Sequence, residues 1–278
     1  MTKEIKIGNV KIGGGNPLAL IAGPCVIESQ ELCFQIGKEV KAICRELGIP
    51  YIFKASYDKA NRTSVNSSRG PGLIEGLQIL AEIRSSLGVP VLTDVHEVCQ
   101  VEDVAKAVDI LQIPAFLCRQ TDLVLAAAET GKAVNIKKGQ FLSPYDMKNI
   151  VDKAASTGNE QIMLTERGVT FGYGNLVVDM KSLPIMRELG YPVVFDATHS
   201  VQRPGGLGTA TGGDREYVPH LVRAACAVGI DALFLEVHPN PESALSDAAT
   251  MLPLGQLKSV LEQAKAMDEA MRKTEKNE

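Results

Sequence analysis

The feature that most constrains the fold is a unit that recurs from Leu18 onward: a short apolar run, a cluster of polar residues and an amphipathic stretch. Each apolar run is continuous rather than alternating, which is typical of parallel strands that are covered on both faces. The unit therefore predicts a parallel α/β fold. Eight such runs occur, at 18–22, 51–53, 89–92, 110–113, 133–136, 161–164, 193–195 and 232–235.

The segments between these runs have helical periodicity. In 29–47, apolar residues recur every three or four positions, and Ser29 is a candidate N-cap. Eight strand–helix units in about 250 residues predict a (β/α)8 TIM barrel, with 1–278 as a single domain. A doubly wound open sheet is the alternative. Its phosphate fingerprints, GxGxxG and GxxxxGK[ST], follow none of the predicted strands.

Both ends and one internal segment depart from this unit. Within 1–17, polar and apolar residues alternate around Gly8-Asn9, which predicts a short N-terminal β-hairpin. The charged tail, 272–278, is expected to fray. The stretch 202–213 contains five glycines and follows a predicted strand, so it is a candidate lid over the site.

The composition excludes several classes of protein. Lys plus Arg total 29 and Asp plus Glu total 33, so the net charge of −4 does not suggest nucleic-acid binding. The apolar runs are far shorter than the roughly 18 residues that a membrane span needs. The polar N-terminus does not resemble a signal peptide. Six scattered cysteines without a CxxC pair predict reduced thiols and a cytoplasmic protein.

Basic residues gather where the predicted strands end, which is where a barrel carries its chemistry. In an acidic chain, this gathering predicts a site for phosphate or carboxylate groups. Ordinary surface charge, paired with Asp58, Glu97 and Glu166, is the alternative. The basic residues are Lys54, Lys59, Arg62, Lys137 and Arg167.

Other strand ends carry the types of side chain that bind a divalent first-row metal: Cys25, His199, Glu236 and Asp247. They lie far apart in the sequence, so local spacing gives no support. A buried structural thiol and a hydrogen-bonded histidine remain the alternative, and His96 and His238 are further candidates. Lys54 could also form a Schiff base with a carbonyl substrate, as in an aldolase.

Several contiguous motifs resemble the 3-deoxy-D-manno-octulosonate 8-phosphate synthase family, from about Leu18 to the last predicted helix. They are IAGPC (21–25), FKAS (53–56), NRT (61–63), QIPAFLCRQ (112–120), NIKKGQF (135–141), TERGVTFGYGN (165–175), FDATHSVQ (195–202) and the segment 236–247.

This resemblance implies a (β/α)8 transferase that condenses phosphoenolpyruvate with D-arabinose 5-phosphate and releases phosphate, on the route to a core sugar of lipopolysaccharide. It also implies a cytoplasmic homotetramer with small-molecule substrates. The related 3-deoxy-heptulosonate 7-phosphate synthases, which use erythrose 4-phosphate, typically have Lys-Pro-Arg-Thr where this chain has KANRT (59–63). A phosphosugar-binding protein without activity is a further alternative.

The resemblance also assigns roles to residues. The positions that match phosphoenolpyruvate-binding residues are Lys54, Ser56, Lys59, Gln112, Lys137 and Arg167. The positions that match sugar-phosphate-binding residues are Asn61, Arg62, Thr63 and Arg119, and Arg119 is expected to act across a subunit interface. The expected catalytic residues are Lys59, Lys137, His199 and Asp247.

Metal-dependent members of this family have Cys after Gly-Pro, and metal-independent members have Asn. The resemblance therefore implies that Cys25 binds a divalent ion together with His199, Glu236 and Asp247. This set accommodates Fe²⁺, Zn²⁺, Mn²⁺ or Co²⁺, and the sequence does not choose among them.

Overall fold

The computed structural model describes residues 1–62, 64–206 and 211–275, apart from the side chain of Glu275. Eight parallel strands form a closed barrel. The barrel closes where the last two of these strands in chain order, β11 and β14, pair with each other. This closure confirms the predicted TIM barrel over the open sheet. In chain order, the barrel strands are β3 (Ala19–Gly23), β4 (Tyr51–Lys54), β5 (Val91–Asp94), β6 (Ile110–Ile113), β7 (Ala133–Lys137), β8 (Ile162–Glu166), β11 (Val193–Asp196) and β14 (Ala232–His238).

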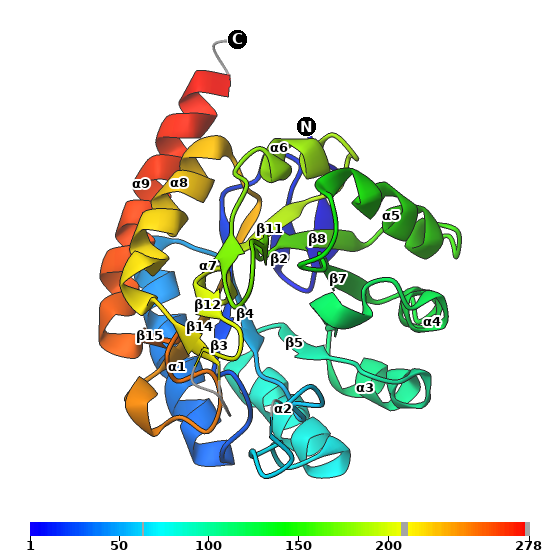
Figure 1. The fold of residues 1–278 in the computed structure, drawn as a ribbon, viewed down its shortest axis with the longest axis vertical. Helices are drawn as coiled ribbons and strands as arrows, with labels where there is room; N and C mark the ends of the chain where they lie inside the picture. Colours follow the sequence, from blue (N-terminus) through cyan, green and yellow to red (C-terminus); the bar gives the residue numbers. More distant parts are fainter. Residues whose placement is uncertain (63, 207–210, 276–278) are drawn as a thin grey trace.

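Helices alternate with these strands and surround the barrel (Figure 1). Helix α1 begins as the sequence predicts, because Ser29 accepts a hydrogen bond from the backbone N–H of Leu32. The helices are α1 (Gln30–Leu47), α2 (Leu73–Leu87), α3 (Val101–Ala107), α4 (Thr121–Glu129), α5 (Met147–Ala155), α6 (Ser182–Arg187), α7 (Ala197–Ser200), α8 (Val218–Val228) and α9 (Leu257–Glu275). Short 3₁₀ helices lie at Val98–Gln100, Ala115–Leu117, Pro144–Asp146, Arg215–Tyr217, Pro241–Ser243 and Leu254–Gln256.

The predicted N-terminal hairpin is present and contributes to the core. Strands β1 (Ile5–Ile7) and β2 (Val10–Ile12) pair antiparallel around Gly8-Asn9, and Gly8 has the positive φ of 58° that such a turn needs. The apolar side chains of the hairpin join one buried cluster with inward-facing residues near the start of the barrel strands, such as Ala19 and Ala232. The hairpin therefore covers the end of the barrel opposite to the site.

The strands extend beyond the apolar runs that predicted them. Strand β14 runs three residues past Leu235 to His238, and β7 and β8 reach Lys137 and Glu166. The sheet thus includes buried polar residues at its carboxyl ends, whose positions are fixed by the backbone hydrogen bonds of the barrel.

The tail differs from expectation over residues 272–275, which continue α9. The extension has a physical reason: Arg272 Nε donates to the Asp268 carboxylate at 2.7 Å, and Asp268 is buried against the barrel. Residues 276–278 lie outside the described range. In the described part of the chain, no helix combines the length and the apolar content needed to span a bilayer.

Short antiparallel pairs extend the loops at the carboxyl end of the barrel. The candidate lid, 202–213, begins with β12 and ends with β13, so its two ends are joined by backbone hydrogen bonds. Residues 207–210 of this segment lie outside the described range. The short strands are β9 (Val169–Thr170), β10 (Leu176–Val177), β12 (Gln202–Arg203), β13 (Gly212–Gly213) and β15 (Leu252–Pro253), the last of which pairs in parallel with β14.

Candidate active site

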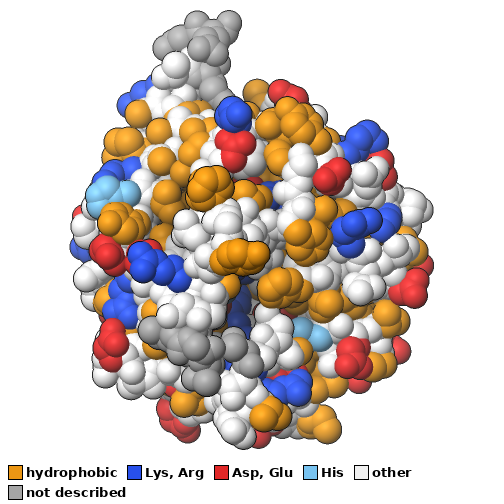
Figure 2. Space-filling model, in the orientation of Figure 1, with side chains coloured by type: hydrophobic (Ala, Val, Ile, Leu, Met, Phe, Trp, Pro, Cys, Tyr) orange, Lys and Arg blue, Asp and Glu red, His pale blue; other side chains and the backbone are white. Residues whose placement is uncertain are grey.

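A cavity of about 390 Å³ opens at the carboxyl ends of the barrel strands. In Figure 2, basic side chains are visible inside a hollow near the centre of this face. Most of the predicted site residues line the cavity, together with residues that follow β4, β6, β11 and β14. The predicted residues that line it are Lys54, Lys59, Asn61, Arg62, Gln112, Lys137, Arg167, His199, Glu236 and Asp247.

Four predicted residues are placed differently. Cys25 is buried beside Asp247, and its Sγ lies 3.2 Å from Asp247 Oδ2. Ser56 is buried and donates its hydroxyl to Asp94, so it supports the cavity rather than lining it. Arg119 is exposed and does not line the cavity of its own chain. Thr63 lies outside the described residues.

A chain of hydrogen bonds crosses the barrel beneath the cavity. Thr165 donates to Asn135 (2.6 Å), Asn135 donates to Gln112 (2.8 Å), and Gln112 donates to Asp94 (2.6 Å). Asp94 also accepts from Ser56. These side chains come from five adjacent strands or strand ends, so the hydrogen bonds connect the cavity floor from β4 to β8.

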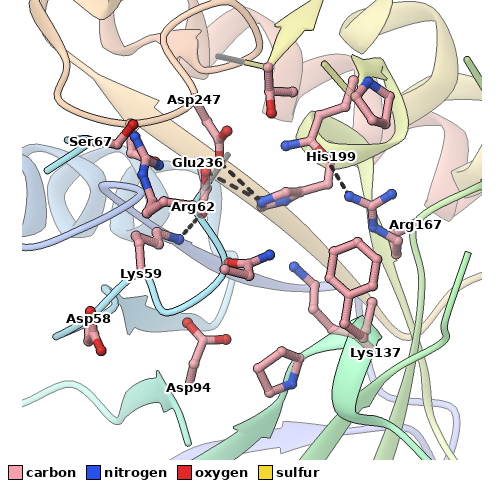
Figure 3. Close-up of a pocket in the computed structure, with 18 of the residues that line it drawn as sticks. Asp58, Lys59, Arg62, Ser67, Asp94, Lys137, Arg167, His199, Glu236 and Asp247 are labelled. Carbon is pink, nitrogen blue, oxygen red and sulfur yellow. Dashed lines mark hydrogen bonds and ion pairs between the residues drawn. The ribbon is translucent and has the colours of Figure 1, made fainter. Parts of the chain in front are cut away.

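Glu236 is the anionic centre of one wall. Its Oε1 lies 2.5 Å from Lys54 Nζ. The same oxygen lies 3.8 Å from Lys59 Nζ, and Figure 3 shows Lys59 pointing toward Glu236. Burial alone would raise the pKa of Glu236, but the adjacent Lys54, followed by His199 and Lys59, outweighs burial and holds that pKa below its usual range. Glu236 therefore stays ionised inside the barrel.

A second ion-pair group surrounds Asp196, the last residue of β11. Its Oδ2 lies 2.6 Å from Lys137 Nζ and 2.7 Å from His199 Nδ1. Burial alone would raise the pKa of Asp196, but His199 and Lys137 outweigh it and lower that pKa. Asp196 thus orients the His199 ring, so that Nε2 faces the other carboxylates.

The Arg167 guanidinium is only partly hydrogen-bonded. Its side chain is only 4 % exposed, and Nη2 donates to Gln202 Oε1 at 2.5 Å (Figure 3). Its Nη1 has no hydrogen-bond partner among the described residues. A buried guanidinium nitrogen without a partner is costly, so the cavity is suited to an anion at this position.

The loop after β14 carries Asp247 and is hydrogen-bonded to the segment that follows β4. Arg62 donates from Nη1 to Ser246 Oγ at 2.6 Å and from Nη2 to the carbonyl of Leu245 at 3.3 Å. Asp247 is a non-glycine residue with a positive φ, 50°. Such a conformation is uncommon for a side-chain-bearing residue, and strained backbone of this kind clusters at functional sites.

Three ligand-type side chains form a possible metal site. The Cys25, Glu236 and Asp247 donor atoms all lie within 4.8 Å of one another. His199 Nε2 lies 3.7 Å from an oxygen of Glu236 and 3.7 Å from one of Asp247. Glu236 Oε2 is buried with no hydrogen-bond partner among the described residues. This orphaned oxygen and the mixed sulfur, nitrogen and oxygen donors fit a divalent first-row ion.

Burial, followed by the negative charges of Asp247 and Glu236, raises the pKa of the Cys25 thiol. A bound cation would offset these negative charges and favour the thiolate form of Cys25. The charge balance of the site is therefore consistent with a metal ion.

Some cavity residues were not assigned by the sequence. Asp94 and Asp196 organise the floor and the His199 ring, and Gln140 and Gln202 line the cavity. His96, a further metal-ligand candidate from the sequence, also lines the cavity. The positions of Asp94 and Asp196 in the sequence could have indicated their roles. Each is the last residue of its strand, and the catalytic residues of a barrel lie at the carboxyl ends of the strands. Gln140 lies in a loop and Gln202 lies in the short strand β12, and the direction of each side chain follows from tertiary structure.

Comparison with known proteins decides the family. The model of the DAHP synthetase I family matches residues 2–273, almost the whole chain. The chain belongs to this family. Its similarity to individual members is also high over the full length, so the barrel, the hairpin and the loops of the cavity are all included in the match.

Three relatives carry the same name, 2-dehydro-3-deoxyphosphooctonate aldolase. The relative from Trichlorobacter lovleyi is 60 % identical over 272 residues, covering 98 % of this chain and all of the relative. The relative from Geotalea uraniireducens is 62 % identical, covering 96 % of this chain and 98 % of the relative. The relative from Fusobacterium nucleatum is 61 % identical, covering 97 % of each chain.

Proposed function

We propose that this chain condenses phosphoenolpyruvate with D-arabinose 5-phosphate and water to give 3-deoxy-D-manno-octulosonate 8-phosphate and inorganic phosphate. The observation that carries the proposal is full-length identity of about 60 % to relatives named for that octulosonate phosphate. The cationic cavity supports the same reading, because both substrates are anions. The product is a precursor of the core sugar of lipopolysaccharide.

The cavity provides separate positions for the charges of the two substrates. For phosphoenolpyruvate, we assign Lys54, Lys59, Lys137 and Arg167 as charge partners, with Gln112 at the floor. For the sugar phosphate, we assign Asn61 and Arg62, which line the cavity in the same segment as Lys59, and Thr63, which lies outside the described residues. Charge-assisted contacts of this kind orient two reactants in near-attack geometry.

The proposed reaction balances without a covalent intermediate on the enzyme. C3 of phosphoenolpyruvate attacks the aldehyde carbon of the sugar, and a carbon–carbon bond forms. Water adds its oxygen to C2, and the C2–O bond to phosphate then breaks, so that phosphate leaves with the bonding electrons. Lys59 and Lys137 offset the charges of the reacting groups, and His199 and Asp247 hydrogen-bond to the water or the aldehyde oxygen.

A divalent metal ion is part of this proposal. Cys25, His199, Glu236 and Asp247 would hold it, and the ion is Fe²⁺, Zn²⁺, Mn²⁺ or Co²⁺. When bound, such an ion supplies Lewis acidity that polarises an oxygen of the sugar aldehyde or of water.

The position of Lys54 argues against a Schiff-base aldolase. Its ammonium is 1 % exposed, contacts Glu236 at 2.5 Å and donates to the carbonyl of Cys25 at 2.8 Å. A Schiff base needs a neutral and accessible amine. Lys54 instead serves as a fixed positive charge.

We also propose that the enzyme is a cytoplasmic homotetramer in which Arg119 completes the site of a neighbouring subunit. Arg119 is exposed and outside its own cavity, and Phe116, three residues earlier, is 58 % exposed at the cavity rim. Burial of this rim by a second subunit would bring Arg119 to a neighbouring cavity. All six cysteines are free, in agreement with a reducing compartment.

Phosphate release tests the function directly. The purified chain is incubated with phosphoenolpyruvate and either arabinose 5-phosphate or erythrose 4-phosphate. We expect release with the five-carbon sugar to exceed release with the four-carbon sugar by at least ~100-fold, since a site built for one set of hydroxyl contacts rejects a substrate that lacks them. Preference for erythrose 4-phosphate would identify a heptulosonate synthase, and binding of both ligands without phosphate release would identify a binding protein.

A further inference from the structure

A second charged pair lies directly behind the cavity and takes no part in the site described above. Lys138 and Glu166 are 0 % and 1 % exposed, and Lys138 Nζ lies 3.5 Å from Glu166 Oε2. Each is a sequence neighbour of a cavity cation: Lys138 follows Lys137, and Glu166 precedes Arg167. Lys138 and Glu166 border a separate pocket of about 360 Å³, whereas Lys137 and Arg167 line the cavity itself.

Glu166 uses both of its oxygens. Oε1 accepts hydrogen bonds from the backbone N–H groups of Arg167 (3.0 Å) and Gly168 (2.6 Å). Oε2 accepts from the hydroxyl of Ser182, in α6, at 2.6 Å and faces Lys138. The carboxylate therefore clamps the turn at which β8 ends, while α6 and Lys138 hold the carboxylate in place.

The clamped turn determines where the Arg167 guanidinium lies. Gly168 has a φ of 87°, a left-handed conformation that turns the chain directly after Arg167, two residues beyond the end of β8 at Glu166. The Arg167 side chain is almost fully buried, and its Nη1 has no hydrogen-bond partner in the part of the chain described. A shift of the Arg167 backbone would thus move a nitrogen that is free for a ligand.

Stability alone gives little reason for such a pair. Replacing a buried ion pair with apolar side chains of similar volume is often neutral or stabilising, because taking two charges out of water is costly. A binding group, in contrast, must be held near its productive geometry by residues packed behind it.

We propose that Glu166 is a positioning residue, which fixes the backbone of Arg167 and so aims the guanidinium at the phosphate of phosphoenolpyruvate. Lys138 and Ser182 hold Glu166 in its clamping orientation. The identity of the anion rests on the proposed function, and the clamp itself rests on the contacts of Glu166.

Two double variants isolate the clamp. Lys138→Met with Glu166→Gln removes both charges but keeps a carbonyl oxygen that can accept from the two backbone N–H groups. Lys138→Met with Glu166→Met removes the charges and the acceptor at similar volume. Both variants lack the ammonium and the carboxylate charge, so a difference between them cannot come from the ion pair. Any difference reports the loss of the acceptor for the two backbone N–H groups.

The expected result is a split between the two Michaelis constants. Relative to the Gln-bearing variant, the variant without the acceptor should have a KM for phosphoenolpyruvate about tenfold higher, since small misplacements of binding groups have large effects. Its KM for arabinose 5-phosphate should change less than about twofold. Equal KM values for phosphoenolpyruvate in the two variants, or equal increases for both substrates, would overturn the proposal.

A single substitution tests the same contact if either double variant fails to fold. Ser182→Ala removes one hydrogen bond to Glu166 and leaves both charges in place. It should raise the KM for phosphoenolpyruvate about threefold at an unchanged KM for the sugar phosphate, in line with the loss of one contact that orients a binding group. An unchanged KM for phosphoenolpyruvate in this variant would count against the clamp.

The clamp and the proposed function fail in different ways. If the wild-type chain releases no phosphate from the two substrates, the proposed function is wrong. Calorimetric binding of inorganic phosphate to the two double variants then still tests the clamp, because weaker binding without the acceptor supports it and equal binding overturns it.

Discussion

At the scale of single residues, the site combines fully paired charges with a few polar atoms that have no partner. Lys54 and Lys137 belong to the first kind and are fixed by ion pairs with buried carboxylates. Arg167 Nη1 and Glu236 Oε2 belong to the second, with no hydrogen-bond partner among the described residues. Because unpaired buried polar atoms are costly, the two kinds separate residues that build the cavity from those suited to bind a ligand.

Arg167→Ala should weaken phosphoenolpyruvate binding and slow turnover. A hydrogen bond to a charged group contributes about 1.5–3 kcal/mol, which corresponds to a loss of roughly 10- to 150-fold in kcat/KM. Steady-state kinetics with phosphoenolpyruvate as the varied substrate would measure it. Arg84→Ala, which removes a guanidinium paired with Asp109 outside the cavity, is the control. A near-normal KM for phosphoenolpyruvate would remove Arg167 from the site.

Cys25→Ala should lose bound metal and activity while the fold is retained. The thiol lies within 4.8 Å of the Glu236 and Asp247 donor atoms, whereas Cys33 is buried in α1 outside this group. Cys33→Ala is therefore the matched control and should keep its metal. Elemental analysis and circular dichroism measure the two effects. Full activity of wild-type enzyme that has been rigorously stripped of metal would show Cys25 to be a structural thiol.

At the scale of elements, close contact between neighbouring strands limits what the site can tolerate. A Cβ on Gly23, at the end of β3, would lie 1.9 Å from the carbonyl oxygen of Lys54 in β4. The glycine allows the two strand ends to approach, which places Cys25 and Lys54 beside Glu236. The contact is with backbone, so no side-chain rotation can relieve it.

Gly23→Ala should therefore destabilise the barrel by about 3 kcal/mol or more, through overpacking against backbone. Chemical denaturation monitored by circular dichroism measures this loss in the free energy of unfolding. Gly255→Ala is the control, since its Cβ would meet no atom within 4 Å and its φ is not positive. Equal stability of the two variants would show that the strand ends can separate without cost.

At the scale of the whole molecule, the proposed tetramer makes each site depend on two chains. Arg119 is exposed outside its own cavity, whereas Lys59 lines the cavity and faces Glu236. Lys59→Ala and Arg119→Ala thus remove groups that, in a shared site, come from different subunits.

Mixing chains that carry Lys59→Ala with chains that carry Arg119→Ala should restore part of the activity. In a mixed interface, one site receives an intact Lys59 from one chain and an intact Arg119 from the other. After random mixing of equal amounts, about a quarter of the sites have both groups. The recovered rate should therefore be at most about a quarter of the wild-type rate, if the sites act independently. Phosphate release after subunit exchange, verified by mass spectrometry, measures the recovery. Exchange without recovery would contradict the role of Arg119 across an interface.

Features that depend on local order along the chain were predictable from the sequence. Continuous apolar runs predicted the strands, helical spacing and Ser29 predicted α1, and Gly8-Asn9 predicted the hairpin turn. Several residues predicted at the strand ends, such as Lys59, Lys137 and Arg167, line the cavity, because every parallel strand of a barrel ends on the same face. The extension of α9 through 272–275 was missed, since it depends on Asp268, which pairs with Arg272 and is held in place by the distant backbone N–H of Leu18.

The sequence by itself determined the order of the barrel strands, the presence of helices between them, and which residues follow each strand. Only the tertiary structure decided the contacts among those residues. It assigned Ser56 to Asp94, Lys54 to Glu236 and His199 to Asp196, and it placed Lys138 and Glu166 together behind the cavity. The physical reason is that the spacing of apolar residues along the chain reflects local backbone hydrogen bonding and burial. These pairs, in contrast, join residues of different strands or set the direction of a side chain that follows a strand. Their geometry exists only once the barrel has closed.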